Sequence, residues 1–472
     1  MRNIRRVLLG LLLGAALLYG QDKHPLGAIL DEESYRNLPR KALLATRAYE
    51  GLPDSFSLKQ FAPQPGDQAD YGTCVAWASA YGARTISESV ALNRRNRDET
   101  TRNAFSPVYV YRSIQPDDPE CQQGAQIHWA LDLMKNSGAV KMLDIERQVD
   151  FARVDPSVYE ESRKYPIADY VTLFSREDRA KPALVVRMVK KSLVEGKPVI
   201  IGMNTPYSFL EANDVWIPEE DSEYFYGGHA MCVVAYDDGR AGGAFEVINS
   251  WGRKWGNAGF MWIPYDSFVD FVMESYEIIE NLAAYSETVS FAGFARVEVR
   301  DEEGFSAVPL TEIAPGVYRT AGAWGAGTEF RFVTGASESA YVYAFAATQA
   351  PDTGSRPGDF FSPVLLFPEA GISPLLNYSD STVILPGNDK TLVLDSEAGL
   401  EHLVVLYAKR TLDIRSIMRR FEDSRGTVEE RLAKALGADL LSEGLRYDEG
   451  SFTGETDDSN AVAALVLALD HR

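Results

Sequence analysis

The stretch Gln68-Ala69-Asp70-Tyr71-Gly72-Thr73-Cys74-Val75-Ala76-Trp77 holds the most informative cysteine of the chain. After Cys74, apolar residues recur at steps of three to five residues as far as Val90, which predicts a helix that begins near the thiol. The free N–H groups at a helix start favour negative charge, and the thiolate is the reactive form of cysteine. Gly72 lies two residues before the thiol and suits close approach of another backbone. Cys74 is therefore a candidate nucleophile.

Two later segments supply partners for this thiol. Gly227-Gly228-His229-Ala230-Met231 carries an imidazole, and Val247-Ile248-Asn249-Ser250-Trp251-Gly252 carries a carboxamide. The β-prone runs that contain them are separated by residues 237–243, which are rich in turn formers. This pattern predicts an antiparallel hairpin that places His229 beside Asn249.

These residue types match the needs of a nucleophilic cysteine hydrolase. His229 would take the proton of Cys74 and later give it to a leaving amine. Asn249 would accept a hydrogen bond from the imidazole and fix its tautomer and direction. The side chain of Gln68 and the backbone N–H of Cys74 would hold the oxyanion of the intermediate. Trp251 would cover the contact between His229 and Asn249 and exclude water from it.

The three segments resemble those of the papain-like cysteine peptidases, family C1, of a secreted bacterial type. The Gln six residues before Cys74 and the sequence His229-Ala230 match the family pattern. The run Asn249-Ser250-Trp251-Gly252, followed by Trp255-Gly256 and Gly259-Phe260, is its most specific part. The resemblance covers residues 51–265 and implies an α+β fold with two lobes, one helical from Cys74 and one β-rich. It implies a cysteine endopeptidase that acts on peptide or protein substrates and needs no cofactor or metal.

A further match, Cys121-Gln122-Gln123-Gly124, resembles the family segment that lines the substrate cleft. The resemblance implies that Gln123, Gly124 and Trp251 contact substrate, with Gly124 offering backbone hydrogen bonds to an extended peptide. The sequence also departs from the family. Tyr71 stands where the family usually has a cysteine, so Cys121 lacks its usual partner. Residues 21–50 are too short for the usual helical propeptide, which argues against latency of that kind.

The domain organisation predicted from the sequence has four parts. Residues 1–20 combine three arginines with an apolar run too short to span a bilayer, which indicates a signal peptide and export to the periplasm or the outside of the cell. A retained membrane anchor is the alternative. Residues 21–50 form a lead-in, residues 51–282 the papain-like domain, and residues 283–472 a β-rich, sandwich-like C-terminal domain, because short strand candidates alternate there with Gly and Pro.

Residues 341–412 resemble a bacterial C-terminal domain of unknown function that is often joined to peptidase domains. That likeness implies a module that interacts with a protein partner or the cell surface. The formal net charge of −21 argues against a nucleic-acid partner, whose phosphates need basic residues.

The histidines and cysteines do not have the spacing of metal ligands. Cys121 and Cys232 are both expected to be reduced thiols. Two alternatives to the endopeptidase remain open. The same residues could act as an exopeptidase or transpeptidase, or the chain could be a binding protein with a vestigial peptidase domain.

Overall fold

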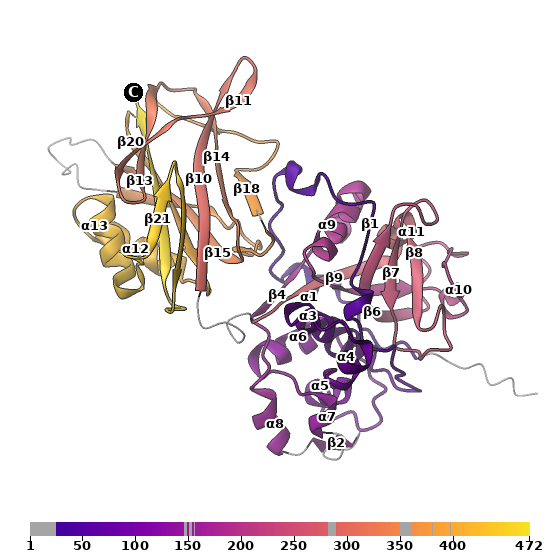
Figure 1. Cartoon of the computed structure of the whole chain (residues 1–472). Helices are drawn as coiled ribbons and strands as arrows, with labels where there is room; N and C mark the ends of the chain where they lie inside the picture. The colour runs from indigo at the N-terminus through magenta and orange to yellow at the C-terminus, as the bar shows by residue number, and fades with distance from the viewer. Residues whose placement is uncertain are drawn as a thin grey trace, which may run out of the picture.

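The structure is a computed structural model that describes residues 25–145, 149–150, 153–154, 156–281, 289–349, 361–379, 381–396 and 398–472. The expected signal peptide at residues 1–20 lies outside the described residues, and so does the expected domain boundary near residue 282. Figure 1 shows a β-rich C-terminal part on one side and a part that mixes helices and strands on the other. Within the described ranges, no helix is long and apolar enough to cross a membrane.

A helix begins at Cys74, as the sequence predicts, but its middle is a π-helix. It runs through α2 (Cys74–Ala76), the π-segment (Trp77–Arg84) and α3 (Thr85–Ala91). The sequence also predicts a helix at residues 126–135 that stops near Ser137-Gly138, and a helix at residues 183–195 that stops at Gly196. Both are confirmed, as α6 and α9, with ends one residue from those expected. The other helices of this part are α1 (Glu32–Arg36), α4 (Arg97–Arg102), α5 (Pro107–Ile114), α6 (Ile127–Asn136), α7 (Met142–Ile145), α8 (Pro156–Ser162), α9 (Pro182–Val194), α10 (Tyr207–Leu210) and α11 (Tyr265–Phe271).

One antiparallel sheet organises the other half of this part, with strand order β4-β9-β5-β6-β7-β8 and β1 paired to β6. The predicted hairpin is confirmed as β6 and β7, in which Cys232 lies opposite Ile248. The sheet strands are β1 (Ser55–Ser57), β4 (Asp169–Thr172), β5 (Val199–Thr205), β6 (Gly227–Asp237), β7 (Ala244–Ile248), β8 (Phe260–Pro264) and β9 (Val272–Ile279), while β2 (Val149–Asp150) and β3 (Arg153–Val154) form a separate pair.

The C-terminal part is β-rich, as expected, and contains two sheets. One has the order β18-β14-β10-β22-β21 with β11 and β19 attached, and the other has the order β12-β13-β23-β20-β15-β16 with β17 attached. A shared cluster of buried apolar side chains joins them, to which Phe332 contributes from one sheet and Leu465 from the other. Helices α12 and α13 pack on the second sheet through Phe421 and Leu432.

The predicted strand runs of this part are confirmed, and so are two helices that the sequence favours at residues 412–421 and 427–436. The elements are β10 (Val289–Asp301), β11 (Gly304–Ala307), β12 (Leu310–Ala314), β13 (Val317–Trp324), β14 (Glu329–Ala336), β15 (Ala340–Gln349), β16 (Phe361–Phe367), β17 (Leu375–Leu376), β18 (Ser381–Leu385), β19 (Leu392–Val393), β20 (Gly399–Ala408), α12 (Ile414–Asp423), α13 (Val428–Leu436), β21 (Leu445–Asp448), β22 (Ser451–Thr456) and β23 (Val462–His471).

Residues 25–50, which we call the strap, join the two parts. The backbone N–H of Arg40 donates to Gly371 in the C-terminal part, and that of Lys41 donates to Thr172 in β4. Figure 1 shows the indigo strap passing between the two parts beside α9. The sequence suggests a polar lead-in here, but Tyr35, Leu44 and Tyr49 of the strap are buried, so the strap is part of the core.

A buried carboxylate in the peptidase part forms hydrogen bonds with the strap and with the C-terminal part. Glu277 of β9 is fully buried, and its Oε1 lies 2.7 Å from Nζ of Lys41 in the strap. Asn377 Nδ2 donates to the same oxygen at 2.6 Å, while the hydroxyls of Ser192 and Tyr378 donate to Oε2 at 2.8 and 2.9 Å. Burial alone would raise the pKa of Glu277, but Lys41 and the donated hydrogen bonds lower it, so the carboxylate stays ionised.

Candidate active site

The imidazole of His229 is held at the start of β6, next to the end of β7. Its Nε2 lies 2.7 Å from Oδ1 of Asn249, which also accepts the backbone N–H of Ser250 at 2.7 Å. Trp251 stacks on the imidazole, with ring centroids 4.3 Å apart and planes 25° from parallel. His229 is fully buried, and Trp251 is only 4% exposed. Trp251 therefore covers the face of the imidazole and offers little surface of its own to a substrate.

Cys74 begins the helix that packs against this strand. Its thiol is fully buried and lies beside the backbone N–H groups of Ala230 and Gly27. Burial raises the pKa of Cys74 to about 11, and hydrogen bonds from those N–H groups lower it only in part. In this state the thiol is neutral, although it lies at a helix start beside the residue that follows His229.

The side chain of Gln68 is almost completely buried between the two halves of the site. Its Oε1 accepts the hydroxyl of Ser250 at 2.5 Å, which fixes the orientation of the amide. Its Nε2 donates to the carbonyl oxygens of Tyr71 at 2.7 Å and Pro25 at 3.0 Å. The amide group that sequence reasoning assigns to an oxyanion thus already binds a carbonyl oxygen of the strap.

Residues 25–30 of the strap fill the space beside Cys74. The N–H of Ala28 donates to the carbonyl of Gly228 at 3.0 Å, on the His229 side of the site. On the opposite side, Ala28 forms a parallel bridge with Ala125, whose N–H donates to the carbonyl of Gly27 at 2.9 Å. A Cβ atom on Gly27 would lie 2.0 Å from the carbonyl oxygen of Gly72, so only glycine fits there. The strap therefore occupies the position that an extended peptide would need.

The backbone of the neighbouring Gly124 makes hydrogen bonds within the protein. Its N–H donates to the hydroxyl of Tyr111 at 3.0 Å and its carbonyl accepts from Gln115 at 2.6 Å, so both groups are used inside the protein. In this structure the backbone bonds to the strap come from Ala125. Gln123 is exposed, and its N–H donates to Asp118 at 2.9 Å. The substrate contacts expected of Gly124 and Gln123 stay predictions.

The side chain of Leu30 in the strap lies beside Gly202 of β5. A Cβ atom on Gly202 of β5 would lie 2.7 Å from the Leu30 side chain and 3.3 Å from that of Glu274 in β9. Oxygens of Glu274 accept the backbone N–H of Asp31 at 3.1 Å and the hydroxyl of Tyr276 at 2.8 Å. Sequence reasoning missed Glu274, because no motif surrounds it and only the strand pairing brings β9 to the site.

The remaining candidates are the other cysteines and possible metal ligands. Cys74, Cys121 and Cys232 are all free and buried. The buried side chain of Cys232 packs against Gly82 of the π-segment, which agrees with its expected place in the core. No cluster of His, Cys, Asp and Glu able to hold a metal ion occurs within the described ranges.

Comparison with known proteins identifies this part of the chain. Residues 60–280 match the family described as papain family cysteine protease. They are a papain-family cysteine protease domain. An uncharacterized peptidase C1-like protein of Acanthamoeba polyphaga mimivirus is 26% identical over 270 residues, which cover 53% of this chain and 80% of the relative. The recognition of a papain-like cysteine peptidase is therefore confirmed, and the chain contains a cysteine peptidase. The secreted bacterial type and the likeness of residues 341–412 stay predictions.

Solved structures of cysteine proteases are also similar to this chain. Xylellain, a cysteine protease from Xylella fastidiosa, shows 19% identity and a TM-score of 0.44, with 54% of this chain and 96% of xylellain covered. Digestive procathepsin L 3 of Tenebrio molitor larval midgut shows 17% identity and a TM-score of 0.37, with 53% of this chain and 82% of that protein covered.

Proposed function

We propose that the chain is an exported cysteine endopeptidase that hydrolyses peptide bonds through Cys74, His229 and Asn249. The observation that carries this proposal is the fixed imidazole of His229, oriented by Asn249 at 2.7 Å and covered by Trp251, at the strand start against which Cys74 lies. Binding alone has no need of an imidazole held in this way, which disfavours a vestigial domain. Export rests on the arginines and apolar run of residues 1–20.

In the proposed reaction, the thiolate of Cys74 attacks the carbonyl carbon of the scissile bond. His229 takes up the thiol proton and then donates it to the leaving amine, which leaves a thioester on Cys74. Water, deprotonated by His229, hydrolyses the thioester and restores the thiol. The amide of Gln68 donates to the oxyanion, in the place where it now binds the carbonyl of Pro25.

The strap makes the described state inactive. It blocks the approach of substrate along the backbone of Ala125 and Gly228. It also occupies the donor of the Gln68 amide with the carbonyl of Pro25, and it excludes the water that would stabilise a thiolate on Cys74. Activity therefore requires that residues 25–30 leave the site, by cleavage or by displacement. The lead-in is too short for a helical propeptide, but a few residues in an extended conformation suffice to cover the thiol.

The two-lobed peptidase would then work beside a sandwich-like C-terminal domain that serves as an interaction module for a protein partner or the cell surface. The two β-sheets and their shared apolar cluster support a rigid module of this kind.

A covalent epoxide probe for cysteine peptidases tests the proposal. The full chain and a form cut after residue 30 are incubated with the probe and with an internally cleavable peptide blocked at both ends. We expect labelling and internal cleavage in the cut form, little of either in the full chain, and neither in Cys74→Ala. Absence of labelling in the cut form would favour a binding protein, and removal of terminal residues only would favour an exopeptidase.

A further inference from the structure

Residues 206–226, which we call the aromatic loop, connect β5 to β6 and carry a group of exposed rings. The side chains of Tyr207, Tyr224, Phe225 and Tyr226 are between 37% and 63% exposed. The rings of Tyr207 and Tyr226 meet edge to face with centroids 5.8 Å apart, so both ends of the loop contribute to one surface. Figure 1 shows α10, which lies in this loop, at the edge of the peptidase part away from the C-terminal part. Large apolar side chains gathered in water in this way mark a surface that binds a partner.

The backbone of the aromatic loop is held in place by side-chain hydrogen bonds. The carboxylate of Glu220 accepts the backbone N–H of Ser208 at 2.9 Å and the hydroxyl of the same residue at 2.5 Å. Asn204, near the end of β5, donates from Nδ2 to the carbonyls of Ser222 and Tyr224 at 2.9 and 3.0 Å. The exposed rings are therefore presented on a fixed frame, and a ligand that binds them loses little free energy to ordering the loop.

The first part of the aromatic loop packs against the candidate active site. Phe209 of α10 is buried and meets Trp251 edge to face, with ring centroids 5.9 Å apart. Trp251 is the ring that stacks on the imidazole of His229. Trp255 also donates from Nε1 to the carbonyl of Leu210 at 3.1 Å. The helix α10 is therefore fixed to the segment that covers the proposed base.

The last part of the aromatic loop leads into the wall of the site. Tyr226 directly precedes Gly227 of β6, and a Cβ atom on Gly227 would lie 2.5 Å from the side chain of Leu26 in the strap. The other end of the site is where Leu30 of the strap lies. The aromatic surface therefore continues the strap interface beyond Leu26, and Leu26 shows that this wall accepts an aliphatic side chain.

Carboxylates border the exposed rings. Glu219, Asp221 and Glu223 are exposed, and the N–H of Tyr224 donates to the carbonyl of Asp221 at 2.9 Å, so a turn places acidic residues beside the rings. Within the described ranges, Glu223 alone of these three has an ion-pair partner, Arg176 at 3.1 Å. The surface therefore repels acidic segments and accepts apolar segments, including those that also carry lysine or arginine.

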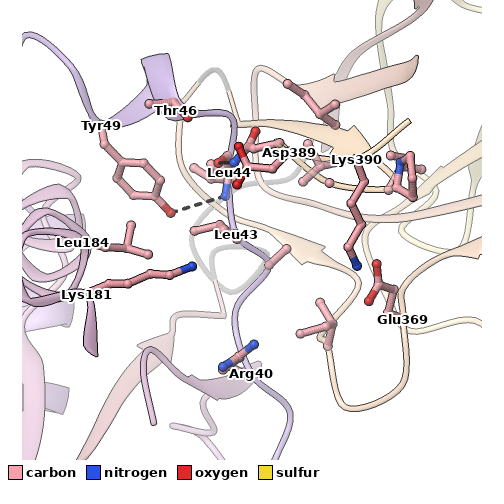
Figure 2. Close-up of a pocket in the computed structure, with 18 of the residues that line it drawn as sticks. Arg40, Leu43, Leu44, Thr46, Tyr49, Lys181, Leu184, Glu369, Asp389 and Lys390 are labelled. Carbon is pink, nitrogen blue, oxygen red and sulfur yellow. Dashed lines mark hydrogen bonds between the residues drawn. The ribbon is translucent and has the colours of Figure 1, made fainter. Parts of the chain in front are cut away.

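A cavity of about 590 Å³ between the strap and the C-terminal part offers no comparable preference. Figure 2 shows Lys390 extended toward Glu369 on one side of this cavity, with Lys181 on another side. Because cations and carboxylates line the cavity together, its charges select no single class of ligand.

We propose that the aromatic loop binds an apolar, non-acidic segment of the protein substrate that adjoins the residues cleaved at Cys74. This inference rests on the proposed function, because the site supplies the rest of the substrate's contacts. The segment follows the course of the strap beyond Leu26 and lays aromatic or branched side chains against Tyr224 and Phe225. Since this surface does not touch the reacting atoms, its contacts lower KM and leave kcat nearly unchanged.

Peptides extended on either side of the cleaved bond test this surface in the form cut after residue 30. The internally cleavable, blocked peptide is extended with Phe-Leu, Gly-Ser or Glu-Glu, close to the cleaved bond. We expect Phe-Leu to raise kcat/KM by about 5- to 20-fold over Gly-Ser on one side only, as for partial burial of such side chains. Glu-Glu on that side should fall below Gly-Ser. Phe225→Ser should remove most of the Phe-Leu gain, and Ile313→Ser, which changes a 57% exposed side chain in the C-terminal part, should keep it.

A binding measurement separates failure of this inference from failure of the proposed function. Fluorescence anisotropy of the same peptides on the cut form of Cys74→Ala should give the same order of Kd values, and adding Phe225→Ser should remove the advantage of Phe-Leu. If this order holds while the cut wild type cleaves none of the peptides, the peptidase proposal fails and the apolar surface stands. Equal Kd and kcat/KM for Phe-Leu and Gly-Ser on both sides would overturn the inference, and so would a gain that persists in Phe225→Ser.

Discussion

His229 is restrained in two directions, which matters because a general base must direct its other ring nitrogen toward the nucleophile. The hydrogen bond to Asn249 fixes the ring in its own plane, and the Trp251 stack fixes the tilt of that plane. Ser250 contributes indirectly, since its backbone N–H orients the Asn249 oxygen and its hydroxyl orients Gln68. A single turn after β7 therefore sets the directions of both the base and the oxyanion donor.

Replacement of Asn249 by Ala should slow the form of the enzyme cut after residue 30, because the His229 imidazole loses the hydrogen bond that orients it. The loss of one hydrogen bond to a group that becomes charged costs about 1.5–3 kcal/mol, or about 10- to 150-fold in kcat, with KM nearly unchanged. Steady-state kinetics on a blocked peptide measures both constants. Asn249→Asp keeps an acceptor and should retain more activity than Asn249→Ala. Equal kcat values for the wild type and Asn249→Ala would show that Asn249 does not orient the base.

The carboxyl group of Glu274 should make strap docking depend on pH. Burial, with a smaller contribution from the nearby Asp31 carboxylate, raises its pKa to about 7, although the hydrogen bonds from Tyr276 and the Asp31 N–H lower it in part. Once the strap leaves, water reaches the group and its pKa falls toward the ordinary 4.5. Docking therefore takes up a proton, so docking is strongest below pH 4.5 and weakens as the pH rises to about 7.

Hydrogen exchange at the Ala28 amide in Cys74→Ala, corrected for intrinsic exchange, measures this effect. Protection should fall by roughly ten-fold or more between pH 5 and pH 7.5. Glu274→Gln should remove most of this change, and Glu33→Gln, at an exposed position of α1 in the strap, should leave it unaltered. Protection that stays constant, or that increases with pH, would contradict the assigned role of Glu274.

At the scale of secondary-structure elements, local sequence patterns were sufficient to predict many helices and strands. The β6–β7 hairpin was predictable because two β-prone runs flank a turn, and this register is what brings Asn249 to His229. Helix α9 was predictable because its apolar residues repeat with helical period and Gly196 follows its end. The strands of the C-terminal part could be anticipated in the same way, since turn residues separate them.

Elements that depend on distant partners could not be predicted in this way. The strap has no strong pattern of its own, and its conformation comes from backbone groups of Ala125, Gly228 and Gly371 that lie far away in the sequence. The π-segment after Cys74 was also missed, since π- and α-helices share almost the same apolar pattern. Glu274 became visible as a site residue only through the pairing of β9 with β5.

A methyl group on Gly27 should loosen the strap. In Gly27→Ala the new Cβ would lie 2.0 Å from the Gly72 carbonyl oxygen, so the strap or the loop before Cys74 must shift. Overpacking of this kind costs about 1–3 kcal/mol, which raises the open population by about 5- to 150-fold. Epoxide labelling of Cys74 in the full chain at fixed pH should rise accordingly. Ile29→Ala removes a partly exposed side chain from the same segment and should change labelling much less; similar rates in the wild type and Gly27→Ala would contradict strap inhibition.

At the scale of the whole molecule, the strap, the peptidase sheet and the C-terminal part meet at Glu277. Lys41, Asn377 and Tyr378 reach this one carboxylate from the strap and the C-terminal part. Burial lowers the pKa of Lys41 to about 7 even though Glu277 favours the charged form, so this cation depends on Glu277 to remain charged. The peptidase and the C-terminal part are therefore joined by a desolvated polar junction, which tolerates the loss of a partner poorly.

Glu277→Ala should destabilise the whole chain and separate the unfolding of its two parts. Removal of one member of a buried ion pair costs about 3–5 kcal/mol, because Lys41 and the surrounding donors lose their acceptor. Urea unfolding, followed by tryptophan fluorescence and by far-UV circular dichroism, should show a lower midpoint and two transitions in place of one. Arg163→Ala breaks an exposed pair and should cost less than about 1 kcal/mol. If Glu277→Ala cost no more than Arg163→Ala, the junction would not hold the two parts together, and the strap would have to be retained by its contacts around Cys74 alone.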